Sequence, residues 1–219
     1  MENKKYKLTG ESIAVEGKTL YRIEALKDFG EIKKGDKGGF IESENNLAHE
    51  GNAWVSDDAC VYDNARVYDN AWVSDNSLVW GNARVYNNAR VCGNASVYGN
   101  ACVFGYACVY DNAWVSGNGQ VYGNARVYGD ALVCGDACVC GDAEISTDAD
   151  YIVFKNWWSS GRYFTWTRSN NMWSVGCFYG TGDELVKKAY KDSSKSGRQY
   201  ERIVKYVEET LKEEENGEH

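Results

Sequence analysis

The sequence has 219 residues and a formal net charge of −8, from 32 acidic and 24 basic side chains. This acidic balance argues against DNA or RNA binding, because phosphate backbones are bound by clustered Lys and Arg. No run of about 18 apolar residues occurs, so no membrane span is expected. The polar N-terminus lacks a signal region, and we therefore expect a cytoplasmic protein whose eight cysteines are reduced thiols.

Residues 1–50 are expected to form a β-rich N-terminal cap. They contain short polar and apolar alternations separated by glycine-rich turns, as in residues 33–39, Lys-Lys-Gly-Asp-Lys-Gly-Gly. Such a loop can hold phosphate, but this one lacks the spacing of a P-loop. The predicted role of the segment is therefore to cover the first coil of the repeat domain that follows.

Residues 51–152 form seventeen uninterrupted six-residue units. The third position is Ala in fifteen units and the fifth is Val in fifteen, while the first two positions are mostly Gly, Asp and Asn. Positions three and five point to one side of a strand, and Gly, Asn and Asp tolerate turn conformations. With three sides per coil, or about 18 residues per turn, the units predict a parallel β-helix with a solid Ala and Val core.

This pattern resembles the hexapeptide-repeat, left-handed β-helix superfamily of trimeric, acyltransferase-like proteins. The variant with Tyr or Ser after Val and Gly-Asn before Ala resembles the phage and prophage members, as do residues 21–28, 35–42 and 175–180. The resemblance implies a mainly β protein built on a single-stranded, left-handed parallel β-helix. It also implies a homotrimer and, for a phage-encoded protein, a location in the host cytoplasm.

Stacking of every third unit predicts three columns of outward side chains at position four. We expect the first, mostly apolar, column to pack against neighbouring subunits. Arg66 and Arg84 of the third column are candidate ligand-binding residues, because they flank an aromatic ladder at the corner and would form an anion or nucleotide groove between subunits. The alternative is that like residues stack only because the repeats are nearly identical. The first column is Cys60, Leu78, Ser96, Trp114, Leu132 and Asp150; the third is Arg66, Arg84, Cys102, Gln120 and Cys138; the ladder is Tyr68, Tyr86, Phe104 and Tyr122.

Residues 153–219 are expected to form a small α+β module that ends in two helices. Residues 151–182 contain no acidic side chain, although the whole chain is acidic. Aromatic rings stack on a base and Arg pairs with phosphate, so this segment suits a flat anionic ligand. The alternative is that its rings form the core of a cap on the helix end. The candidate binding residues are Trp157, Trp158, Arg162, Tyr163, Trp166, Arg168 and Trp173.

Neither catalysis nor metal binding is expected. Acyl transfer on this repeat normally needs a His and a loop that leaves the coil, yet the chain has only His49 and His219 and no such loop. Cys134, Cys138 and Cys140 are expected on different sides of the prism, where they cannot converge on a metal. We therefore expect no catalytic residue, no metal ligand and no cofactor.

Two functional hypotheses remain. The first is a non-enzymatic, phage-type binding protein that sequesters a small anionic aromatic ligand, such as a nucleotide signal of bacterial antiviral defence. The second is an oligomeric scaffold whose apolar columns and Trp-rich cap bind a host or phage protein.

Overall fold

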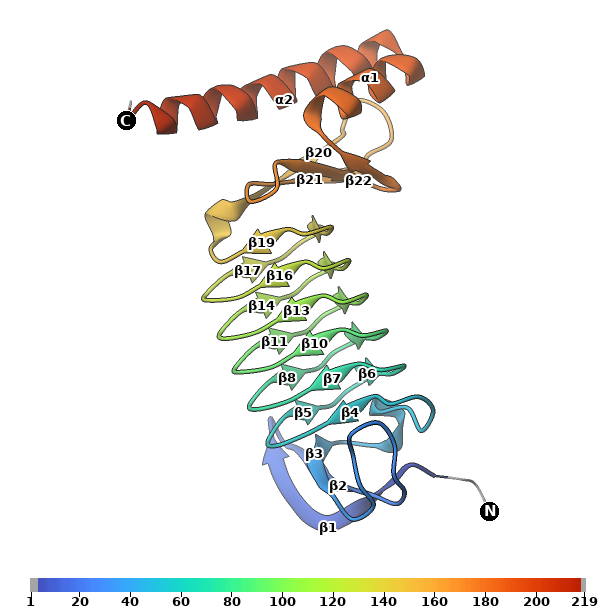
Figure 1. Cartoon of the computed structure of the whole chain (residues 1–219). Helices are drawn as coiled ribbons and strands as arrows, with labels where there is room; N and C mark the ends of the chain where they lie inside the picture. Colours follow the sequence, from blue (N-terminus) through green and yellow to red (C-terminus); the bar gives the residue numbers. More distant parts are fainter. Residues whose placement is uncertain (1–3, 218–219) are drawn as a thin grey trace.

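The computed structural model describes residues 4–217 and shows a parallel β-solenoid with a β-rich cap at one end and an α+β module at the other (Figure 1). Sixteen two-residue strands, β4 to β19, begin six residues apart along the chain. Strands of successive coils pair in parallel with a separation of 18 residues, as Arg66 does with Arg84. No helix among residues 4–217 is long and apolar enough to cross a membrane.

The solenoid strands form three columns that confirm the predicted stacking, with one exception. Asp150 lies outside its expected column, in the short 3-10 helix η2 (Asp148–Asp150) that follows the last strand. The first column is β5 (Cys60–Val61), β8 (Leu78–Val79), β11 (Ser96–Val97), β14 (Trp114–Val115) and β17 (Leu132–Val133). The second is β4 (Trp54–Val55), β7 (Trp72–Val73), β10 (Arg90–Val91), β13 (Cys108–Val109), β16 (Arg126–Val127) and β19 (Glu144–Ile145). The third is β6 (Arg66–Val67), β9 (Arg84–Val85), β12 (Cys102–Val103), β15 (Gln120–Val121) and β18 (Cys138–Val139).

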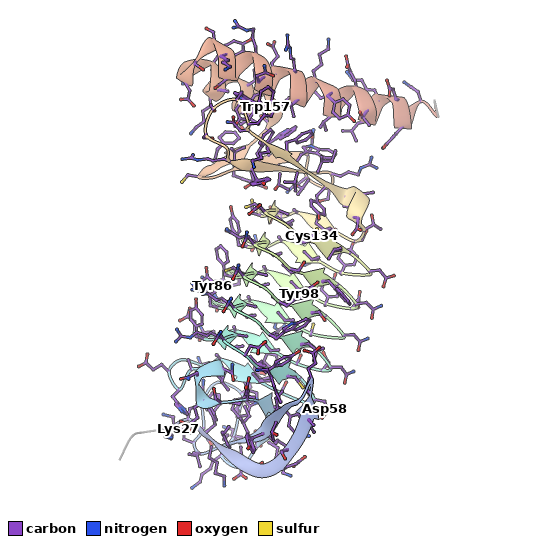
Figure 2. The ribbon with its side chains drawn as sticks, turned by 180° about the vertical axis from the view of Figure 1, so that it is seen from behind. Lys27, Asp58, Tyr86, Tyr98, Cys134 and Trp157 are labelled. Atoms are coloured by element: carbon purple, nitrogen blue, oxygen red, sulfur yellow. The ribbon has the colours of Figure 1, made fainter. Side chains whose placement is uncertain are left out.

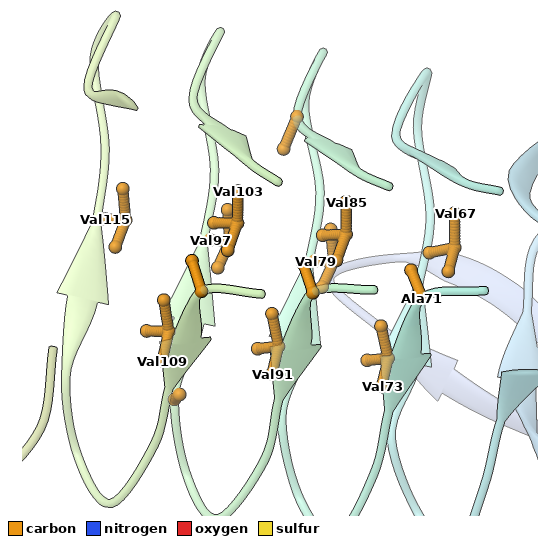
Figure 3. Packing of buried hydrophobic residues seen from close by; sticks show 14 of the residues in the cluster. Val67, Ala71, Val73, Val79, Val85, Val91, Val97, Val103, Val109 and Val115 are labelled. Atoms are coloured by element: carbon orange, nitrogen blue, oxygen red, sulfur yellow. The ribbon is translucent and has the colours of Figure 1, made fainter. Parts of the chain in front are cut away.

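The interior of the solenoid is filled by the Ala and Val side chains, which form rows along its axis (Figure 3). Val97, Val103 and Val109 are each 0% exposed. Ser77 replaces one inward Ala, and its hydroxyl donates to the Ser74 carbonyl at 2.7 Å, which satisfies the buried polar group. A tube packed in this way confines ligand binding to its outer faces and its ends.

The turns explain why Gly and Asp alternate at the first position of the units. This position has a positive φ, for example +56° at Asp63 and +69° at Gly81. Glycine adopts that conformation without strain, and Asp tolerates it. An Asp there also accepts a hydrogen bond from the next coil, as Asp63 Oδ2 does from the Gly81 N–H at 3.2 Å.

The N-terminal cap places hydrogen-bond donors on the first coil. Its strands are β1 (Tyr6–Val15), β2 (Lys18–Ala25) and β3 (Lys37–Ile41), followed by the 3-10 helix η1 (Glu44–Asn46). Each coil donates the N–H groups of positions two, four and six of its units to carbonyls of the next coil, so the carbonyls of positions one, three and five in the first coil have no partner within the solenoid. The Phe40 N–H donates to the Ala59 carbonyl at 2.8 Å, and the buried Asn46 amide donates to the Ala65 carbonyl at 2.9 Å.

The C-terminal module begins with an antiparallel sheet that lies across the last coil. It comprises β20 (Tyr151–Lys155), β21 (Tyr163–Thr167), β22 (Met172–Val175) and β23 (Phe178–Gly180). Helices α1 (Gly182–Asp192) and α2 (Ser194–Glu215) pack on the other face of this sheet (Figure 1). Thr181 caps α1, since its hydroxyl accepts from the Glu184 N–H at 3.3 Å.

Candidate functional site

A concave pocket of about 410 Å³ lies in the C-terminal module between the loop 156–162, α1 and the start of α2. This volume lies within the range of small-molecule sites. Its wall is amphipathic, because Phe178, Val175 and Leu185 contribute apolar surface while serine hydroxyls and two cations contribute polar groups. We call this site the module pocket.

Two basic side chains from different elements line the module pocket. Arg162 ends the loop after β20, and Lys188 lies on α1. Both are exposed, and within residues 4–217 neither is ion-paired to a carboxylate. The Lys188 ammonium lies 5.6 Å from the centroid of the Phe178 ring. Asp192 is the single acidic residue of the lining, so the pocket carries a net positive charge.

Asn156 holds the loop that carries Arg162. It is 3% exposed, and its side-chain amide donates to the Tyr200 hydroxyl at 3.1 Å. Its carboxamide oxygen accepts from the Ser159 N–H at 3.0 Å, and its backbone N–H donates to the Arg162 carbonyl at 2.7 Å. Burial raises the pKa of Tyr200, so this hydroxyl stays neutral. The loop is therefore closed at its base, which fixes the position from which the guanidinium extends.

Three of the predicted stacking residues are core residues instead. Trp158, Trp166 and Trp173 are 9%, 2% and 2% exposed and pack with Phe164 between the sheet and the helices. The Trp166 Nε1 donates to the Asn171 carboxamide oxygen at 2.9 Å. The prediction of these rings as ligand platforms is thus corrected, since their faces already contact other side chains. The alternative, in which aromatic residues form the core of a cap, describes these three.

The remaining predicted residues of the module lie at its surface but do not meet at one site. Trp157 is 77% exposed (Figure 2), and Tyr163 is 39% exposed with the Lys155 ammonium 5.1 Å from its ring. Arg168 is ion-paired with Glu214 of α2, at a separate depression. Of the predicted set, only Arg162 lines the module pocket.

Arg66 and Arg84 lie far from the module, near the N-terminal end of the solenoid on β6 and β9 (Figure 1). They flank the predicted aromatic ladder, in which Tyr68 and Tyr86 stack with ring centroids 4.9 Å apart. Tyr86 is visible on the outside of the solenoid, well below Trp157 (Figure 2). The structure therefore separates the two predicted groups of binding residues into two places.

Sequence reasoning missed Lys188, Asn156 and Tyr200. Lys188 is one of several lysines on the helical surface, and no local pattern distinguishes it from Lys187. Asn156 stands between a strand and a Trp pair, which is a weak signal for a turn residue. Only the packing of α1 and α2 against the loop brings these side chains to one pocket.

The expectation that Cys138 and Cys140 lie on different sides of the prism is wrong. Residues two apart on a strand point to the same side. The Ser174 hydroxyl donates to Cys138 Sγ at 3.1 Å, and Tyr122 Oη lies 3.5 Å from the same sulfur. A hydrogen bond with Cys140 lowers the pKa of the Cys138 thiol, so the two side chains lie next to each other. No group of three potential metal ligands occurs among the described residues.

A comparison with protein-family models agrees with this architecture. The YdcK β-solenoid repeat model matches residues 59–75 and 120–135, both within the solenoid. The chain is a β-solenoid repeat protein. The match is similarity over two short segments and does not reach the C-terminal module. No curated protein matches the chain.

Proposed function

We propose that this β-solenoid protein is a non-catalytic binding protein that captures a small anionic ligand of the nucleotide class in the module pocket. The observation that carries the proposal is the presence of two cations without carboxylate partners, Arg162 and Lys188, in one amphipathic pocket. A guanidinium binds phosphate oxygens in a bidentate manner, and Lys adds a compact charge. Phe178 and its apolar neighbours provide a surface for a base.

His49 lies in the N-terminal cap, where its Nε2 is 3.4 Å from the Glu44 carboxylate. Its Nδ1 accepts from the Lys5 N–H at 3.3 Å, and its ring stacks on Tyr6 with centroids 4.3 Å apart. Both contacts belong to the packing of the N-terminal cap, at the opposite end from the module pocket. His219, the other histidine considered from the sequence, lies outside the described residues.

The finer parts of the proposal rest on the sequence resemblance. We infer a left-handed, hexapeptide-repeat helix, a homotrimer and a phage origin. In a phage-infected cell, a protein that binds a nucleotide without consuming it would act by sequestration. We therefore propose that it removes a nucleotide signal of antiviral defence from the host cytoplasm.

Titration calorimetry against a panel of linear, cyclic and ADP-ribose-type nucleotides tests the proposal. We expect one ligand class to bind, and we expect Arg162→Ala and Lys188→Ala each to weaken it by about tenfold or more, since each removes a charge-assisted hydrogen bond. Lys187→Ala is the matched control, because it removes the adjacent lysine of α1 without touching the pocket. Absence of binding at millimolar concentration, or equal affinity in all four proteins, would contradict the proposal.

A second candidate function is an oligomeric scaffold, favoured by the first solenoid column. Trp114 is 49% exposed there, and its ring lies edge-on to Tyr98 at 6.1 Å, between the half-buried Leu78 and Leu132. An exposed apolar column is typical of a protein-binding or subunit surface. Native mass spectrometry of the wild type and of Trp114→Glu tests this. A trimer that the substitution dissociates would support the interface, and a monomeric wild type would contradict it.

A further inference from the structure

An aromatic ladder follows the third column of the solenoid. Tyr68, Tyr86, Phe104 and Tyr122 occupy equivalent positions in successive coils. Their ring centroids are 4.9, 4.9 and 4.8 Å apart, and neighbouring ring planes differ by 2°, 5° and 10°. Each ring therefore covers one face of the next, and only the two outermost faces of the ladder are left for other contacts.

The upper end of the ladder is closed. Cys140 is the next member along the chain beyond Tyr122, and it is 2% exposed beneath the C-terminal module. Tyr122 also contacts Cys138 through its hydroxyl, at 3.5 Å. No ligand can reach that end without displacing the module.

The lower end differs, because the ladder position below Tyr68 belongs to Ala48. The Ala48 N–H donates to the Val67 carbonyl at 3.0 Å. The Tyr68 N–H makes the equivalent bond to the Val85 carbonyl at 3.1 Å, one coil higher. A methyl group thus stands where each higher coil has a ring. A pocket of about 570 Å³ lies at this position, lined by Ala48 and Tyr68.

Charged groups surround this pocket, which we call the Tyr68 slot. Arg66 and Arg84 line it and pair as neighbours across β6 and β9. Neither is ion-paired within residues 4–217. Of the two acidic residues in the lining, Asp69 already accepts a hydrogen bond from the Asn87 N–H at 3.2 Å. Glu50 is exposed. The slot therefore combines one ring face, two guanidinium groups without ion-pair partners and the carboxylates of Glu50 and Asp69, so its formal charges balance.

We propose that the Tyr68 slot binds a planar aromatic anion, whose ring takes the vacant ladder position and whose acidic group pairs with Arg66 and Arg84. Stacked rings are favourable at centroid distances of about 4.5–7 Å, which the coil spacing already provides for the ladder. Arg supplies bidentate pairing to a carboxylate, sulfonate or phosphate. The site is distinct from the module pocket and stands without it.

A fluorescence titration with 2-naphthalenesulfonate tests the proposal, with cyclohexanesulfonate as a non-planar competitor of the same charge. We expect the naphthalene compound to bind and the cyclohexane compound to compete at least about tenfold less well. Arg84→Ala and Arg66→Ala should each weaken binding. Arg162→Ala alters only the module pocket and should leave the affinity for the probe unchanged. The proposal for the Tyr68 slot and the proposed function of the module pocket can therefore be refuted independently.

The decisive variant is Ala48→Tyr, which supplies the missing ring from the protein itself. It should abolish binding of the probe and raise the melting temperature, because the ladder gains one stacked pair. The rise in melting temperature shows that the variant is folded, so loss of binding then reports occupation of the slot. Unchanged probe affinity in a folded Ala48→Tyr protein, or equal competition by cyclohexanesulfonate, would overturn the proposal.

Discussion

Different backbone groups predominate at the two ends of the solenoid, and the two caps differ accordingly. At the N-terminal end the free groups are carbonyls, and the cap supplies donors. Lys5 is an example, since its ammonium donates to the Ala53 carbonyl at 2.7 Å. At the C-terminal end the module supplies acceptors to several N–H groups, and the Tyr151 hydroxyl donates to the Leu132 carbonyl at 2.9 Å. The Thr165 hydroxyl accepts from the Cys138 N–H at 2.8 Å, and the Ser169 hydroxyl accepts from the Glu144 N–H at 2.7 Å.

The difference shows that the position of a residue in the repeat dictates which backbone group it presents to a cap. The N–H groups of positions two, four and six are directed toward the next coil, and the carbonyls of positions one, three and five toward the previous one, and burial of either without a partner is costly. The two caps are therefore not interchangeable. The direction of these backbone groups also explains why buried cationic and amide donors occur at the N-terminal end, and hydroxyl and carboxylate acceptors at the C-terminal end.

The largest expected effect comes from Asn46→Leu at the N-terminal end. The Asn46 amide is fully buried and donates to the carbonyls of Asp63 at 3.0 Å and Ala65 at 2.9 Å. Its loss leaves two buried acceptors unpaired, so the free energy of unfolding should fall by about 3 kcal/mol. Urea unfolding measures this. Asn64→Ala, in the exposed ladder of side-chain amides, should change stability by less than about 0.5 kcal/mol.

A smaller effect is expected from Thr165→Val at the C-terminal end. The substitution keeps the shape of the side chain and removes the acceptor for the Cys138 N–H. We expect a loss of about 2 kcal/mol, together with faster hydrogen exchange at Cys138. Thr210→Val is the control, because that hydroxyl only donates to the carbonyl of Tyr206 in its own helix. If Thr165→Val and Thr210→Val have the same free energy of unfolding, the Thr165 hydroxyl is not needed as an acceptor.

The smallest effect concerns pH at the C-terminal joint. Partial burial raises the pKa of Asp150, but hydrogen bonds from Ser146 and Thr147 lower it more, so the net shift is downward. A carboxyl with a lowered folded pKa stabilises the protein above its unfolded pKa of about 3.9, and this contribution is lost as the pH falls through the folded pKa.

Asp150→Asn should therefore cost about 1 kcal/mol at pH 7 and progressively less below about pH 4. Thermal unfolding of both proteins between about pH 2 and about pH 7 measures the difference in stability. A loss of stability in Asp150→Asn that is independent of pH would contradict the assignment of Asp150 as an ionised acceptor of backbone N–H groups.

The solenoid and the presence of a small sheet followed by two C-terminal helices were predictable from the sequence, whereas the module pocket was not. The spacing of Ala and Val fixes strand register, so the repeat pattern alone places Arg66 and Arg84 side by side on neighbouring strands. In β21, however, both faces are buried. Thr165 faces the solenoid and Trp166 faces the helices, so alternation could not separate core rings from exposed ones. The module pocket depends on long-range packing of α1 and α2, which no periodic pattern in the sequence indicates.

The central claim is that the solid tube leaves ligand binding to the exterior, with the nucleotide-class ligand held in the module pocket. Nuclear magnetic resonance of the isotopically labelled protein, titrated with the calorimetric nucleotide panel, tests it most directly. The account predicts shifts at the loop 156–162 and the facing parts of α1 and α2 that are lost in Arg162→Ala, with the indole signals of Trp166 and Trp173 unchanged. Shifts centred on the solenoid core, or no shifts with any nucleotide at millimolar concentration, would contradict it.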